Sequence, residues 1–531
     1  MMYRGKGTIT VFLSLISMLF LSLFCTMAES ARVQAARTQA AAAFDMGLFS
    51  VFGEYDSVLL EEYDVWFFDA SRQAGRFSED IPEKLLADYI SPNIHVTEGI
   101  SAVRTWNLFP TEMDECTVDK YALATDDGGQ VFYRQVMENE RELLAGNVAA
   151  ALQKNIHEAE QQEKRGEQYE WEAERADRNL QNALEDQKRI QEEEAQSTGV
   201  TQQGEPGSTE VTRQGEQNTD ESVIPATAEN PLESIKKLKK LGILGLVRKN
   251  ASEVSDREIK IKNLPSGRSL QKGNLKIKGE SVGAFSELIF LEYLKNHFIC
   301  ATDQKKKSDR VHALSYELEY IAGGMKSDVE NLKKVVNKLL LMREGVNYVC
   351  IMGSAAMQEK TAALAAAIAG ASAVPVLTAA FQKAIMLAWA YGESLLDVRT
   401  LLAGGKVPLT KTEADWKLSL ENLGRLEEVL QSCDEGKGRG CTYREYLIGI
   451  LALEQKKKRN LRTLDLIEAN RRMEDGGEGF RADALMAQME AHVSFELAPV
   501  FLAVPAVWMQ ISNQGTAYFV KGQYGYMEGG V

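Results

Sequence analysis

The segment GKGTITVFLSLISMLFLSLFCTMAESARVQAAR, residues Gly5–Arg37, decides where the chain sits and how it is built. Its apolar part, Ile9–Ala28, is 20 residues long and contains no charge. A helix of that length spans about 30 Å, which is the hydrocarbon thickness of a bilayer. Because Arg4 and Lys6 precede the run, the positive-inside rule predicts a cytoplasmic N-terminus and an extracytoplasmic body. The sequence therefore predicts a single-pass cell-membrane protein that contacts the lipid bilayer through Ile9–Ala28.

The fate of this run has more than one interpretation. A secretory signal has an apolar region of about 7–15 residues, which is shorter than this one. We therefore favour a retained anchor, although the small residues Thr26 and Ala28 leave cleavage after Ala28 open.

The residues that follow continue a helical pattern. Apolar or small side chains recur at gaps of three and four, at Val33, Ala36, Ala40, Phe44, Leu48, Val51, Tyr55 and Val58. This spacing places them on one helical face, and we expect a continuous helix from Ile9 to about Tyr63. It is either an anchor followed by an amphipathic helix folded onto its own domain, or a pilin-like spine.

The composition indicates a globular protein that does not bind nucleic acid. The chain has 531 residues, of which 44% are hydrophobic and 26% charged, and its formal net charge is −15. A chain of this length is expected to form two or three folded units. Because phosphate binding needs a basic face, the acidic balance predicts no nucleic-acid partner.

Composition shifts divide the chain into four parts. Residues 1–28 form a cytoplasmic stub and the transmembrane anchor. Residues 29–196 are predicted to hold a juxtamembrane helix, a small mixed region and a long charged helix. Residues 197–231 contain few aliphatic side chains and are predicted to be a disordered linker. Residues 232–531 are predicted to form an α+β, predominantly helical domain.

The charged segment from about Gln135 to Gln196 contains a short seam with a 4-3-4-3 spacing. Its members are Tyr169, Ala173, Ala176, Leu180, Ala183, Gln187 and Ile190. Such spacing is typical of a coiled coil, but these side chains are small and mixed. We therefore favour a solvated helix or a helical hairpin within the chain over an intermolecular coiled coil.

Local patterns predict several further elements. The turn signal Asp126–Gly129 leads into the strand-like run QVFYRQV, and ALSYELEYIAGG, residues 313–324, alternates like a strand. The C-terminal residues are predicted to form a β-hairpin about Asn513-Gln514-Gly515. Thr361–Phe381 lacks charge, but it is rich in alanine and interrupted by Pro375. We favour two buried helices there over a second membrane span.

No stretch of the sequence carries a recognisable catalytic motif. A P-loop, a GxSxG elbow, an HExxH pair and a CxxC pair are all absent from it. His297 and Cys300 could share a helical face, but two ligands do not make a zinc site. Glu393 and Asp397 could form a catalytic pair, although we favour a structural ion pair with Arg399. We therefore predict no catalytic, cofactor-binding or metal-binding residues and no cofactor.

One pair of cysteines is a candidate disulfide. Cys433 and Cys441 bracket the glycine-rich stretch CDEGKGRGC, which lets the chain double back. An exported body would allow the bond to form. The alternative is two free thiols that flank an exposed turn.

Two resemblances extend this picture. The start of the chain, RGKGTITVFLSL…ESARVQAAR, resembles TadE/TadG-type pseudopilins of tight-adherence (Tad) pilus systems. The resemblance implies a processing site between Gly7 and Thr8, and a glutamate fifth in the mature chain, where this sequence has Phe12.

Farther along, YDSVLLEEYDVWFFD, HALSYELEYIAGGMKSDVENLKKVVNKLLLMREGVNY, AWAYGESLLDVRTLLAGGKVPLTKT and TYREYLIGIL resemble an uncharacterised (domain-of-unknown-function) family of Firmicute membrane proteins. This second resemblance implies a membrane-tethered, extracytoplasmic protein and supplies no activity.

Together these features predict a non-enzymatic envelope protein of structural or assembly type, with pilus or secretion-system proteins as partners. The alternative is an exported carboxylate-dependent hydrolase or carbohydrate-acting enzyme, because acid–base carboxylates need no local motif.

Overall fold

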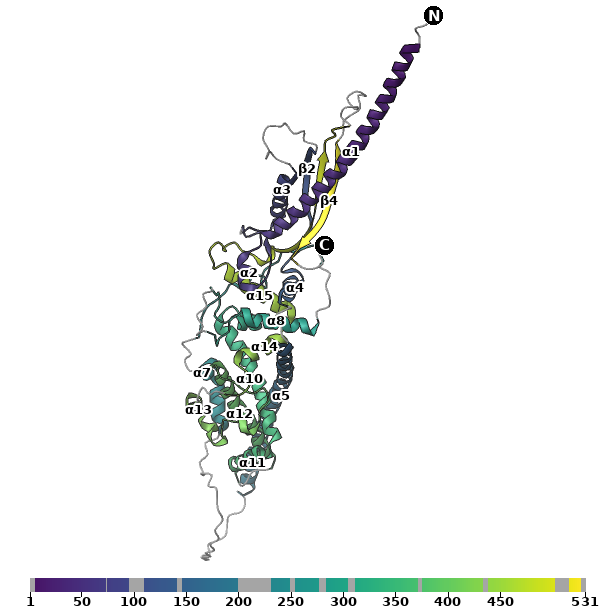
Figure 1. Cartoon of the computed structure of the whole chain (residues 1–531). Coiled ribbons are helices and arrows are strands. Elements are labelled where there is room, and N and C mark those ends of the chain that lie inside the picture. Colours follow the sequence, from purple (N-terminus) through teal and green to yellow (C-terminus); the bar gives the residue numbers. More distant parts are fainter. Residues whose placement is uncertain are drawn as a thin grey trace, which may run out of the picture.

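The fold is α+β and predominantly helical, as the sequence predicts, and its described part contains one antiparallel sheet and one long apolar N-terminal helix. The computed structural model describes residues 5–72, 74–94, 109–140, 146–198, 231–248, 254–276, 283–303, 311–370, 375–432, 438–501 and 515–526. Figure 1 shows a sheet lobe, from which helix α1 projects, and below it a helical lobe.

The second half of helix α1 (Gly5–Gly53) packs in the sheet lobe, and its first half projects beyond that lobe (Figure 1). Its second half buries Ala36, Ala40, Phe44, Leu48 and Val51, which confirms most of the predicted face. The helix ends ten residues before the predicted Tyr63, since Tyr55 and Asp56 pair with the backbone of Phe68 and Phe67 instead of continuing it, and a separate helix, α2 (Ser57–Tyr63), follows. The Asp56 carboxylate caps α2 by accepting the N–H groups of its first turn.

The sheet is built around β3 (Leu485–Leu497). Strand β2 (Thr111–Leu123) pairs along one edge of β3, and β1 (Phe68–Asp69) and β4 (Thr516–Gly525) pair along the other, all antiparallel. Alternate side chains of β3 are buried in one apolar core with α1 and α3 (Asp80–Ile94). The opposite face carries the charged side chains, which is the pattern of a sheet covered on one face.

Glycine is required where α1 crosses β4. A Cβ added at Gly522 would lie 2.8 Å from the Phe44 ring. Only a residue without a side chain lets the helix approach the strand this closely.

The C-terminal strand pair corresponds only in part to the predicted hairpin. Strand β4 is where the sequence predicts a strand, but its partner is β3, which the sequence analysis did not assign. The predicted turn residues Asn513 and Gln514 lie outside the described residues.

The helical lobe packs around three long helices. Helix α5 (Gly146–Thr198) lies against α10 (Asp328–Gly353) and α12 (Pro375–Leu402). A Cβ added at Gly166 of α5 would lie 2.9 Å from the carbonyl oxygen of Leu341, and one added at Gly345 of α10 would lie 2.4 Å from the carbonyl carbon of Arg165, so the close approach of the two helices requires glycine at both positions. The other helices are α4 (Asp126–Glu140), α6 (Pro231–Lys240), α7 (Ile243–Val247), α8 (Ala284–His297), α9 (Glu317–Gly323), α11 (Ala355–Ala369), α13 (Leu426–Ser432), α14 (Tyr443–Leu453) and α15 (Lys456–Arg471).

The predicted seam on α5 packs inside the chain. Tyr169, Ala176, Leu180 and Ala183 are buried in the core of the helical lobe. This is the intramolecular interpretation that the sequence favoured.

Two strand predictions are wrong. The run after Asp126–Gly129 is helical and belongs to α4, since Gly128 and Gly129 adopt positive φ angles and redirect the chain. The run ALSYELEYIAGG contains the short helix α9, all of whose residues are buried. The alternation misled because Glu317 and Glu319, whose spacing indicates an exposed strand face, are themselves buried in the helix.

The predicted linker, residues 197–231, is not a boundary between the two lobes. Residues 197 and 198 close α5, and the rest of 197–231 except Pro231 lies outside the described residues. Each lobe takes segments from both sides of it: the sheet lobe joins α1 to β3 and β4, and the helical lobe joins α5 to α10 and α12.

The apolar stretch Thr361–Phe381 is divided between two helices, as predicted, but most of its described side chains are not buried. Helix α11 ends at Ala369 and α12 starts at Pro375, the predicted interruption. Among the described residues, α1 is the one helix long and apolar enough to cross a membrane.

Candidate functional site

The free half of α1 is a surface suited to lipid. Its large side chains are exposed, with Ile9 66%, Phe12 63% and Leu19 66% accessible. Exposed apolar side chains on all sides of a helix are costly in water and favourable in a bilayer.

A buried ion pair marks where α1 enters the sheet lobe. Arg32 donates from Nε to Glu29 Oε1 at 3.0 Å, and from Nη2 to the carbonyl of Ala498 at 2.6 Å. The other oxygen of Glu29 accepts the N–H groups of Val500 and Phe501. The first charged residue after the apolar run is therefore bound to the segment that follows β3, which fixes the helix at its exit from the lobe.

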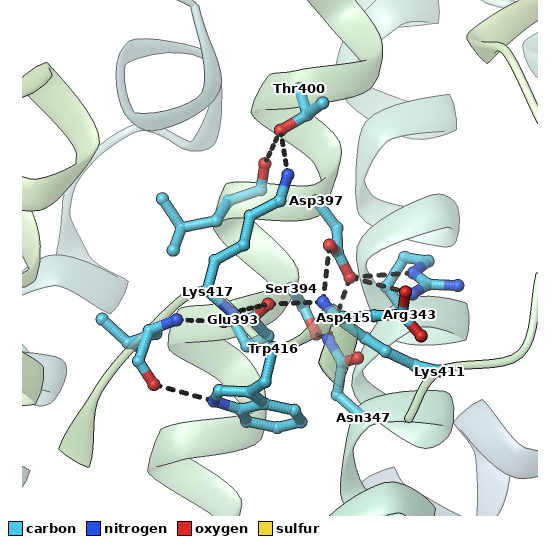
Figure 2. A network of polar contacts seen from close by, with 12 residues as sticks. Arg343, Asn347, Glu393, Ser394, Asp397, Thr400, Lys411, Asp415, Trp416 and Lys417 are labelled. Atoms are coloured by element: carbon cyan, nitrogen blue, oxygen red, sulfur yellow. Dashed lines mark hydrogen bonds and ion pairs between the residues drawn. The ribbon is translucent and has the colours of Figure 1, made fainter. Parts of the chain in front are cut away.

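A network of buried charges connects α10, α12 and the chain after α12 (Figure 2). The Asp397 carboxylate accepts from Arg343 Nη2 at 2.9 Å, from Asn347 Nδ2 at 3.2 Å and from Lys411 Nζ at 2.7 Å. Glu393 accepts the same ammonium group of Lys411. The network thus contains two acids and two bases, and Lys411 bridges the acids.

The pKa values of the two carboxylates shift in opposite directions. Burial alone would raise the pKa of Asp397, but Lys411 and Arg343 lower it to about 2. Burial raises the pKa of Glu393, which Lys411 opposes and the neighbouring Asp397 carboxylate reinforces. Two acids with divergent pKa values are a common signature of acid–base catalysis.

The two carboxylates are closed off from solvent, which indicates a structural role instead of a catalytic one. The side chains of Glu393 and Asp397 are 0% and 1% exposed. Glu393 also accepts the backbone N–H groups of Lys417 and Leu418 at 3.0 and 2.7 Å, so its oxygens are occupied by the chain itself. The predicted partner is wrong: Arg399 donates to the carbonyl of Leu246, and the partners of the two acids are Lys411 and Arg343.

An open polar cleft of about 640 Å³ lies beside the sheet lobe. Its lining includes the acids Glu79, Asp80 and Asp483. Burial would raise the pKa of Asp483, but Arg481 and Arg268 hold it at about 2. Asp483 is therefore an ion-pair member and not a proton donor.

A third cluster joins three helix ends. His297 Nε2 lies 3.3 Å from Asp64 Oδ2 and 3.6 Å from Glu140 Oε1. These side chains come from the end of α8, the residue after α2, and the end of α4. Cys300 is buried and does not belong to this group of three potential ligands. Sequence reasoning singled out His297 but had no signal for its two acidic neighbours, which lie more than 150 residues away.

The other predicted site residues lie apart from these clusters. Gly7 and Thr8 are in the first turns of α1. Cys441 pairs its backbone with Val407, and Cys433 lies outside the described residues, so the disulfide stays a prediction.

The fold and these sites define a class: a protein whose described residues include one candidate membrane-spanning helix, an antiparallel sheet packed on that helix, and a helical lobe that contains a buried network of ion pairs. The chain belongs to a family of unknown function, DUF5702, whose model matches residues 221–497. No curated protein and no solved structure matches the chain.

Proposed function

We propose that the protein is a non-enzymatic, membrane-anchored envelope component whose body lies outside the cytoplasm and serves a structural or assembly role. The observation that carries the proposal is the division of α1. One uninterrupted helix presents an apolar half to its surroundings and gives its other half to the core of the sheet lobe.

This division couples the membrane to the folded body. A flexible tether would let the body move freely above the bilayer, whereas a helix shared by both transmits its orientation. The Glu29–Arg32 pair supports the coupling, because it binds the helix to the lobe directly after the apolar run.

A Tad-type pilus or secretion apparatus is the assembly we propose for it. The support is the pseudopilin-like N-terminal sequence together with a helix that is half free and half packed on an antiparallel sheet, as a pilin-like spine requires. Phe12, where a glutamate is expected, argues against a subunit that polymerises by pairing that carboxylate with a neighbour's amine.

The mature N-terminus tests the proposal. We would purify the protein from native membranes and measure its intact mass, with a Gly7→Val variant as the matched control for processing. A start at Thr8 that the variant abolishes supports the Tad assignment and the anchor together. A start at Met1 supports the anchor and contradicts prepilin-type processing, and a start at Glu29 overturns the anchor.

A further inference from the structure

The cluster of Asp64, Glu140 and His297 lies where three helices of the helical lobe meet just beyond α1. One ligand atom from each residue lies within 4.8 Å of the other two. We propose that the three side chains bind one divalent cation of the zinc or manganese class, with water completing its coordination. This inference does not depend on the proposed function.

The imidazole is oriented as a metal ligand. His297 Nδ1 lies 2.9 Å from the carbonyl oxygen of Glu62, and a carbonyl can only accept, so Nδ1 carries a proton. In the neutral ring Nε2 then carries a lone pair, and this lone pair is directed at the two carboxylates. A backbone carbonyl on the remote nitrogen is one of the usual partners of a metal-bound histidine.

Three electron-pair donors around one point require a positive charge between them. That charge is either a proton on Nε2 or a metal ion. A direct imidazolium–carboxylate bond is about 2.7–2.9 Å long, whereas the two distances here are 3.3 and 3.6 Å. Two ligands about 2.1 Å from a tetrahedrally coordinated ion lie about 3.4 Å apart, close to both observed values.

The same molecule provides the contrast. His492 lies 2.8 Å from Asp119, and His312 lies 2.9 Å from Glu317. Those two pairs have the length of direct hydrogen bonds. The His297 cluster is wider and has a second carboxylate, so it is built differently from the ordinary histidine–acid pairs of this chain.

The ligands are held before any ion arrives. The Tyr293 ring lies 4.4 Å from the His297 ring, centre to centre, and its hydroxyl donates to the carbonyl of Tyr63 at 2.9 Å. Asp64 is in the left-handed conformation that caps α2, and Asn139 donates to its carbonyl at 2.8 Å. Such preorganisation lowers the cost of closing a site.

The exposure of the ligands suits entry of an ion from solvent. The Asp64 side chain is 54% exposed, whereas those of Glu140 and His297 are 9% and 14% exposed. A mixed nitrogen and carboxylate set fits zinc or manganese better than calcium, which prefers oxygen alone. A bound ion would bind α2, the element next to the membrane-anchored helix, to α4 and α8.

Calorimetry on the full-length protein in detergent, stripped with EDTA and dialysed, tests the site. We would titrate ZnCl₂ and MnCl₂ into the wild type and into Asp64→Asn, Glu140→Gln, His297→Asn and, as the matched control, His492→Asn. We expect about one ion per chain, at least tenfold weaker binding in the three cluster variants, and wild-type binding in the control. Absence of saturable binding, or wild-type affinity in Asp64→Asn and Glu140→Gln, would overturn the proposal.

A measurement on the wild type guards against variants that do not fold. Diethyl pyrocarbonate modifies accessible, metal-free imidazoles, and peptide mass spectrometry locates the product. Saturating Zn²⁺ is expected to protect His297 and to leave the modification of His492 unchanged. Protection of other histidines without His297 contradicts the site.

Discussion

Each lobe contains a cluster of two acids and two bases, and the two clusters differ in how far their side chains are exposed to solvent. In the helical lobe, Glu393, Asp397, Arg343 and Lys411 have side chains at most 1% exposed. On the outer face of the sheet, Asp119, Glu490, Lys120 and Lys521 are 14–48% exposed. The distances are alike: Asp397–Lys411 is 2.7 Å and Glu490–Lys521 is 2.6 Å.

The comparison teaches that burial, and not the number or length of ion pairs, decides what each cluster contributes. An exposed pair gains little because water and salt screen it. A buried pair has already lost its hydration, so removal of one partner leaves an uncompensated charge in the core. The helical lobe should therefore depend on its four-charge cluster. The sheet lobe should depend on the apolar contact between α1 and the sheet and on the buried Glu29–Arg32 pair, and little on the cluster of its outer face.

The largest effect is expected for Asp397→Asn. The change keeps the shape of the side chain but leaves Arg343 and Lys411 with one carboxylate between them. We expect the free energy of unfolding of the helical lobe to fall by about 3–5 kcal/mol. Denaturant unfolding followed by tryptophan fluorescence measures it, because Trp389 and Trp416 lie beside the network. A loss below about 1 kcal/mol, as expected for an exposed pair, would contradict the comparison.

The second effect concerns pH. Burial raises the pKa of Glu319 in the helical lobe to about 7, although the Ala301 N–H and the Tyr443 hydroxyl lower it. On the sheet, hydrogen bonds from Lys521 and Lys120 lower the pKa of Glu490. An acid whose pKa is raised in the folded state stabilises the fold at pH values below its unfolded pKa of 4.5. This contribution is lost as the pH rises through the folded-state pKa of about 7.

Between pH 5 and 8 we therefore expect the helical lobe to lose stability through Glu319 while Glu490 contributes no change. The loss is at most about 3 kcal/mol for a pKa difference of this size. Unfolding curves at several pH values check it, with Glu319→Gln as the variant that should reduce the dependence by the share of Glu319. Burial also raises the pKa of Glu344 to about 8 and that of Asp465 to about 6, so part of the dependence stays in the variant. An equally steep dependence in the variant would show that another group is responsible.

The sequence predicted the fold where a pattern is local. The face of α1 follows from the spacing of Ala36, Ala40 and Phe44, and the break at Pro375 follows from proline itself. It misassigned α9 because Glu317 and Glu319 are buried in this helix and so do not mark a face exposed to solvent. It did not identify β3 as the central strand, since its pairing with β2 depends on contacts across more than 300 residues.

The candidate sites were harder to predict for the same reason. The sequence placed Glu393 and Asp397 on one helix but chose Arg399, the nearest cation in the chain. Their partners, Lys411 and Arg343, reach them only through the fold. The neighbours of His297 likewise come from two distant helix ends, which no spacing rule connects.

The third prediction tests the apolar contact on which the sheet lobe depends. Gly522→Val places methyl groups where a Cβ alone would be 2.8 Å from the Phe44 ring. We expect a loss of about 1–3 kcal/mol from overpacking. Hydrogen exchange should rise in peptides from α1 and β4 and remain unchanged around α10 and α12. Gly53→Ala is the control, because a Cβ there meets nothing within 4 Å, and faster exchange in both lobes would contradict a local effect.

The smallest effect is expected for Asp119→Asn, the counterpart of Asp397→Asn on the exposed sheet face. Asp119 contacts His492 at 2.8 Å and Lys521 at 2.9 Å, so on distances alone it would rank with Asp397. Because its side chain is 24% exposed, water hydrates whichever partner is left, and we expect a loss below about 1 kcal/mol.

The effect of salt further distinguishes the penalty of Asp119→Asn from that of Asp397→Asn. Added NaCl should remove the small penalty of Asp119→Asn by screening, and should leave the penalty of Asp397→Asn in place because ions do not reach it. Unfolding of both variants at low and high NaCl measures this difference. If both penalties fell together with salt, the network in Figure 2 would have to be open to solvent, and burial would no longer explain the contrast between the lobes.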